Sequence, residues 1–288
     1  MRPAVEWATR ELRDPRSLWK TAGALQAILS VWLAQATQHN PSLTLLAVVV
    51  WGGAVICMED QMDTLKIRPS QASLVTGLII VLFATWRSCT IMDADTSIFA
   101  LPLLQGIGLA FMTAPIRKVW SLWQPLLVLS LFTLQELISR LLPEQLLASV
   151  TARIGQFILL MCGTNAAASG QFLTTGLRPV FVTGACSSVD LIAQLTVISI
   201  VFVIAFPIKS LPARIFYLAL APICAIVVNA GRIGALAWIT GSDLENREQL
   251  FRFWHDEWGA LVFAGIAMMI MGQIYLTMIE HQLRHDKI

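Results

Sequence analysis

Apolar runs close to the length of a bilayer crossing recur along the whole chain. A helix needs roughly 20 mainly apolar residues to span a hydrocarbon core about 30 Å thick. The pattern therefore predicts about eight transmembrane helices, at residues 20–37, 42–58, 73–91, 97–114, 120–140, 187–206, 212–240 and 257–279. A further apolar stretch, 145–162, contains Arg153 and is ambiguous from its pattern alone.

The composition supports this interpretation. Of the 288 residues, 56% are hydrophobic and only 13% are charged, whereas soluble domains carry about 25% charged residues. We therefore predict an all-α polytopic membrane protein in which residues 1–288 form a single integral membrane domain in contact with lipid. The formal net charge is only +2, so nothing indicates nucleic-acid binding.

The basic residues predict the orientation in the membrane, because cytoplasmic loops carry an excess of Lys and Arg. Every second connection is basic, while the others are neutral or acidic. Both termini are therefore predicted to be cytoplasmic. An A-x-A pattern ends the first apolar run, but its long basic flank favours an uncleaved helix over a signal peptide. The basic groups are Arg2 to Lys20, Lys66 and Arg68, Arg117 and Lys118, Lys209 and Arg214, and Arg284 and Lys287.

The same alternation constrains the ambiguous stretch. An even number of crossings must separate the basic connection at 117–118 from the one at 209–214, and two strong crossings already lie between them. Residues 145–162 are therefore predicted to be an amphipathic helix on the outer face. The segments "QFL" and "PVFV" around "TTGLR" then predict a β-hairpin. Together they form a small extracytoplasmic insert, 141–186, before the sixth crossing and the catalytic half, 187–279.

Five cysteines are present, and no C-x-x-C pair occurs among them. Cys57 and Cys224 fall inside apolar helices and Cys89 near the end of one, which is typical of small core residues. Cys162 and Cys186 are both predicted to lie outside, where a disulfide between them is one alternative. A lone membrane cysteine more often packs than reacts, so the significance of Cys186 depends on its neighbours.

Arg232 lies in the seventh crossing, within "VVNAGRIGAL". An ionisable residue inside a membrane segment is costly and usually functional. Asn229, three residues earlier on the same helix face, is positioned to orient it. The alternative is an arginine that reaches the lipid headgroups or pairs with Asp190.

A histidine is predicted on the same side of the membrane, because "FRFWHDEWGAL" places His255 at the mouth of the eighth crossing. His39 is a rival on that side, although "QHNP" is typical of a turn. His281 and His285 are predicted to lie on the cytoplasmic side. Most interfacial histidines are structural or solvated, so the interest of His255 comes from its predicted proximity to Cys186 and Arg232.

The three side chains form a coherent set for acyl transfer. A thiolate is the attacking species, and a helix start with hydroxyls from Ser187 and Ser188 favours negative charge there. A guanidinium offsets the energetic cost of a thiolate at an apolar boundary, or binds the oxyanion that forms when the thiolate attacks an acyl carbon. A histidine, with an unperturbed pKa of about 6.5, takes a proton and returns it to a leaving amine. The chain contains no H-E-x-x-H motif and no convincing metal-ligand spacing, so no metal or other cofactor is predicted.

The motifs "ACSSVDLI", "NAGRIGAL" and "FWHDEWGAL", in this order, resemble those of the exosortase/archaeosortase family. In that family Cys-Ser-Gly is common, whereas this chain has Cys-Ser-Ser, with Ser188 in place of glycine. Asp190 stands where a basic residue is often found. The overall similarity favours the cyanobacterial branch, the cyanoexosortases.

The resemblance implies a cysteine protease and transpeptidase that is similar to sortases in chemistry but not in fold. Its substrates would be exported proteins with a C-terminal sorting motif of the PEP-CTERM kind, followed by a transmembrane helix and a basic tail. The resemblance makes Cys186 the nucleophile, Arg232 the oxyanion or thiolate partner and His255 the acid/base, with Asn229 as support. It also implies the plasma (inner) membrane, with the site on the extracytoplasmic face. A small-molecule transporter and a non-catalytic assembly protein are the alternatives.

Overall fold

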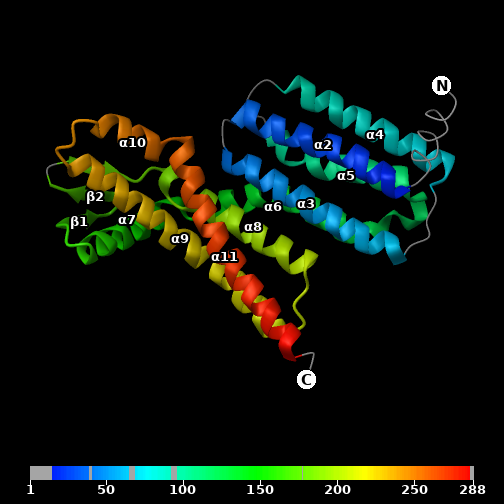
Figure 1. The fold of residues 1–288 in the computed structure, drawn as a ribbon. Coiled ribbons are helices and arrows are strands. Elements are labelled where there is room, and N and C mark those ends of the chain that lie inside the picture. The colour runs from blue at the N-terminus through cyan, green and yellow to red at the C-terminus, as the bar shows by residue number, and fades with distance from the viewer. Residues whose placement is uncertain (1–14, 39–40, 65–68, 92–95, 177, 286–288) are drawn as a thin grey trace. The chain divides into compact units, whose positions relative to one another are not determined.

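The computed structural model describes residues 15–38, 41–64, 69–91, 96–176 and 178–285, and it is mainly helical with one small sheet (Figure 1). By internal contacts the chain divides into two compact units. The first comprises the residues before Gln135 together with Ile204–Phe206. The second comprises Gln135–Val203 and the residues from Pro207 onward. All five predicted site residues belong to the second unit.

The first unit is built from helices that pack through small residues and buried aromatic rings. A Cβ atom on Gly77 would lie 2.5 Å from the backbone oxygen of Gly108, so α4 and α5 approach each other through glycine. Trp19 of α2 and Trp51 of α3 are buried in edge-to-face contact. The elements are α2 (Pro15–Gln38), α3 (Pro41–Thr64), α4 (Gln71–Thr90), η1 (Thr96–Phe99), α5 (Leu101–Thr113), η2 (Ile116–Leu122) and α6 (Trp123–Leu141), the last of which ends in the second unit.

The second unit combines helices with a three-stranded sheet. Its elements are α7 (Glu144–Met161), β1 (Ala166–Ser169), β2 (Phe172–Thr175), β3 (Arg178–Phe181), η3 (Gly184–Cys186), α8 (Val189–Ala205), α9 (Leu211–Gly241), α10 (Arg247–His255) and α11 (Glu257–His285). Helices α7 and α9 pack together, and the sheet contacts both of them. One apolar cluster joins these elements and includes Leu173, Val182, Cys186, Ile233 and Leu236.

Five helical segments within the described residues are long and apolar enough to cross a membrane. They are Leu43–Gln61, Gln71–Thr90, Ile116–Leu141, Leu211–Gly241 and Gly259–Arg284. The predicted polytopic, mainly α-helical membrane protein is thereby confirmed. Helices α5 and α8 are also apolar but shorter, so the count of eight crossings stays a prediction.

The region predicted as an amphipathic helix and hairpin has that secondary structure. Helix α7 buries Ala148, Thr151, Ala152, Gly155 and Leu159 along one face and leaves Arg153 exposed. Strands β2 and β3 pair antiparallel, with Phe172 opposite Phe181. Strand β1 was not predicted, because "AAAS" lacks the β-branched and aromatic residues that favour strands. It forms by pairing with β2.

Candidate active site

Cys186 lies in a tight turn between the sheet and the apolar helix α8. It is the last residue of η3, and its backbone N–H donates to the Thr183 carbonyl at 2.9 Å. Helix α8 begins three residues later. The Ser187 hydroxyl donates to the Gly184 carbonyl at 2.6 Å and stabilises the turn rather than the thiol. Cys186 is only 6% exposed.

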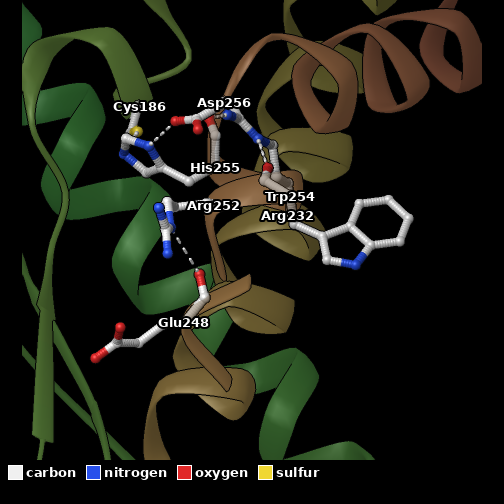
Figure 2. Close-up of polar contacts among 7 residues, drawn as sticks. All are labelled: Cys186, Arg232, Glu248, Arg252, Trp254, His255 and Asp256. Carbon is white, nitrogen blue, oxygen red and sulfur yellow. Dashed lines mark hydrogen bonds and ion pairs between the residues drawn. The ribbon is translucent and has the colours of Figure 1, made fainter. Parts of the chain in front are cut away.

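His255 lies beside the thiol although 69 residues separate the two in the chain. Its Nε2 atom is 3.9 Å from the Cys186 Sγ atom, within the range of a sulfur hydrogen bond (Figure 2). His255 is the last residue of α10 and its ring stacks on Phe251, with ring centroids 5.2 Å apart. The fold therefore brings together the thiol and the imidazole that the sequence predicted to act as a pair.

Asp256 contacts the other side of the imidazole and was not among the predicted site residues. Its Oδ1 atom is 3.2 Å from His255 Nδ1 (Figure 2). A carboxylate in this position orients a histidine and stabilises the imidazolium that forms during acyl transfer. The signal in the sequence is that Asp256 directly follows His255.

We expect Asp256→Ala to lower kcat about three- to tenfold and to leave KM nearly unchanged, because the carboxylate orients His255 without touching substrate. The effect is modest because both side chains are substantially exposed, at 44% and 60%, and water screens their interaction. Asp256→Asn should lower kcat at least as much, because its amide N–H can donate to Nδ1 and hold the tautomer in which Nε2 already carries the proton. Steady-state kinetics of the two variants tests this, and an unchanged kcat in Asp256→Ala would exclude the role.

Arg232 is 7% exposed and its guanidinium donates to the end of α10. The Nε atom is 3.2 Å from the Trp254 carbonyl oxygen and Nη2 is 2.5 Å from that of His255. Carbonyl groups at a helix C-terminus lack intrahelical partners, so these two bonds satisfy them and hold the backbone of His255. The positive charge also lies within electrostatic range of the Cys186 thiol and the Asp256 carboxylate. Arg232 forms no ion pair with Asp190 in the described part of the chain.

Asn229 binds the turn that carries Cys186 and not the side chain of Arg232. Its Nδ2 atom donates to the Cys186 carbonyl at 2.8 Å and to the Ser188 hydroxyl at 2.9 Å. No described hydrogen bond joins Asn229 to Arg232. The hydrogen bonds of Asn229 reach the Cys186 turn and not the arginine that the sequence predicted it to orient. One face of α9 thus fixes the cysteine turn through Asn229 and the histidine helix through Arg232.

The model of the transmembrane exosortase family matches residues 32–272, which is most of the chain and includes all of the candidate site. The chain belongs to this family. No curated protein sequence and no solved structure is detectably similar to it.

Ser188 adopts a backbone conformation that favours glycine. Its φ angle is +74°, a left-handed conformation that non-glycine residues adopt at a cost. The buried Ser188 hydroxyl accepts from Asn229 and lies 2.9 Å from the hydroxyl of Thr151 on α7. These contacts hold Ser188 in its left-handed conformation.

The described structure also bears on Cys162 and His281, two other residues considered from the sequence. All five cysteines are free thiols, so Cys162 and Cys186 are not joined. His281 follows the start of α11 by 24 residues, which is about 36 Å along a helix. His39 is outside the described residues. The described residues contain no group of three or more His, Cys, Asp or Glu suited to a metal ion.

Proposed function

We propose that this exosortase-family chain is a membrane cysteine protease and transpeptidase that cleaves a C-terminal, PEP-CTERM-like sorting signal from exported proteins. The observation that carries the proposal is the 3.9 Å approach of Cys186 Sγ to His255 Nε2. A thiol within reach of an imidazole, which in turn contacts a carboxylate, is an arrangement suited to nucleophilic catalysis. Residues 187–279 would form the catalytic half, with 141–186 as the insert that leads into it.

The proposed reaction begins with transfer of the Cys186 proton to His255 Nε2. The thiolate attacks the carbonyl carbon of the scissile peptide bond and forms a tetrahedral oxyanion. When this collapses, the C–N bond breaks and His255 returns the proton to the leaving amine, which leaves a thioester on Cys186. An acceptor amine or water then attacks the thioester and frees the thiol. These steps need no metal or other cofactor.

Arg232 has two roles in this proposal. Two of the five guanidinium N–H groups donate to the α10 carbonyls, which leaves three donors. These would stabilise the thiolate or the oxyanion in a region of low dielectric. Asn229 and Ser187 act one step away, by holding the backbone turn that carries the thiol.

The proposed substrates are exported proteins that end in a sorting motif, a transmembrane helix and a basic tail. Such a substrate would present its motif at the outer interface of the plasma (inner) membrane. The overall similarity of the sequence favours the cyanoexosortase branch, although Ser188 and Asp190 depart from the common family pattern. The test of the function is the release of an exported reporter fused to a Pro-Glu-Pro motif, a hydrophobic helix and a basic tail.

Labelling of single cysteines tests the proposed orientation. In a chain freed of its native cysteines, Asn165→Cys and Asn246→Cys should react with an impermeant maleimide in intact spheroplasts, because both positions are exposed and lie on the predicted outer side. Lys118→Cys, also exposed, should react only after permeabilisation. Labelling of Lys118→Cys alone in intact spheroplasts would place the site on the cytoplasmic face and contradict the proposal.

A further inference from the structure

Within the described residues, β3 is an edge strand of the three-stranded sheet, and no strand pairs with its outer edge. The strand order is β1-β2-β3, so β3 pairs with β2 on one side only. The chain leaves β3 at Phe181 and reaches Cys186 five residues later. This free edge therefore leads directly to the candidate nucleophile.

The register identifies which backbone groups point to the free edge. The N–H of Val182 donates to the Gln171 carbonyl at 2.9 Å, so Val182 faces β2. Residues in an antiparallel ladder alternate between facing the partner and facing away. Phe181 consequently directs its N–H and C=O groups away from β2. Among the described backbone hydrogen bonds outside the ladder, none involves Phe181.

The side chains agree with this register. Phe172 and Phe181 are directly opposite, and their ring centroids lie 4.9 Å apart. Side chains approach most closely at pairs that exchange no backbone hydrogen bonds. The two rings are also 47% and 48% exposed, so the edge of β3 presents apolar surface next to unpaired backbone groups.

Natural sheets usually protect such an edge against unwanted pairing. Here the strand is only four residues long and contains Pro179, which has no N–H to donate. The edge can therefore accept a short extended segment, and its available backbone groups are concentrated at Phe181, the end nearest Cys186. A protein's extended peptide segment is the partner that fits such an edge, through main-chain hydrogen bonds.

We propose that the substrate residues preceding the scissile bond bind as an added strand along β3 and parallel to it. This inference rests on the proposed function. The segment after the scissile bond would lead into the substrate's membrane helix, so the preceding segment is the one available in extended form. Because β3 runs toward Cys186, a parallel strand delivers its carboxyl end to the thiol. One of its side chains would then lie beside Phe181.

Proline scanning of the reporter tests the added strand without altering the enzyme. Proline removes one backbone N–H at each of the six positions before the Pro-Glu-Pro motif, and alanine at the same positions is the control. We expect the proline-to-alanine ratio of cleavage rates to fall about three- to tenfold at two positions that lie two residues apart, whose N–H groups would bond to the outward carbonyl groups of Pro179 and Phe181. The ratio should stay near one at the other positions. Losses without a two-residue period would overturn the proposal.

Two enzyme variants test the same contact from the other side. Phe181→Ala removes the ring and keeps the N–H, whereas Phe181→Pro removes both. We expect the proline variant to cleave the reporter about three- to tenfold more slowly than the alanine variant. Equal rates would contradict the strand, provided that iodoacetamide alkylates Cys186 equally fast in both. If alkylation differs, the turn is disturbed and the reporter scan decides.

The outcomes also separate this inference from the proposed function. Cleavage that persists in Cys186→Ala, or no cleavage of any reporter, removes the proposed function and the added strand with it. Cleavage that requires Cys186 but shows no two-residue period removes only the added strand.

Discussion

Replacing Cys186 by alanine should reduce release of the sorting-signal reporter by at least about a thousandfold, because removal of a nucleophile leaves only the catalysis that the remaining groups provide. The side chain loses a single buried sulfur atom next to Val182 and Leu236, so the chain should still fold and insert. Release is measured as soluble reporter per unit of enzyme in the membrane fraction.

Cys162→Ala is the matched control for this prediction. Cys162 is an exposed free thiol at the end of α7, and the described contacts give it no histidine partner. The variant should therefore retain nearly full activity. If Cys162→Ala lost activity while Cys186→Ala retained it, the assignment of the nucleophile would be wrong.

Arg232→Lys should lower the rate of reporter release by at least about a hundredfold, comparable to the loss of an oxyanion donor. The guanidinium binds the Trp254 and His255 carbonyls through two different nitrogens. A single ammonium group cannot reproduce that planar arrangement and still offer donors to a reacting oxygen. The substitution therefore weakens both the position of His255 and the stabilisation of developing charge.

The control for Arg232→Lys is Arg153→Lys on the exposed face of α7, which should be within twofold of wild type because surface substitutions rarely matter. Rates are normalised to enzyme in the membrane fraction, which should be near wild type for both variants. Turnover of Arg232→Lys within a few-fold of wild type would leave Arg232 as a structural charge.

The pattern of apolar residues along the chain predicted the long helices but not α10. The apolar runs are long enough to identify α3, α4, α9 and α11, since burial in a bilayer demands a continuous apolar segment. Helix α10 has only nine residues and lies within a polar connection. It forms in contact with α9 and α11, and the sequence "REQLFRFWH" alone did not predict a helix there.

The sequence was sufficient to select candidate site residues, but it did not predict which groups these residues contact. Cys186, Arg232 and His255 could be selected because reactive or charged side chains at apolar helix ends are unusual. Which groups they touch depends on how α9, α10 and the turn at η3 pack together. The sequence therefore assigned Asn229 to Arg232, whereas its hydrogen bonds reach the Cys186 turn. The contact of Asp256 with His255 likewise depends on how α10 ends and α11 begins.

The burial of Cys186 has a consequence for the lifetime of the protein. On the proposed outer face the thiol would meet an oxidising environment, in which accessible thiolates form sulfenic acids and mixed disulfides. Packing among Val182, Ile233 and Leu236 leaves Cys186 only 6% exposed, which slows the approach of an oxidant relative to an exposed thiol. Cys162, which is exposed, is the thiol that such reagents reach first. The packing that positions Cys186 would therefore also slow its oxidation relative to that of Cys162.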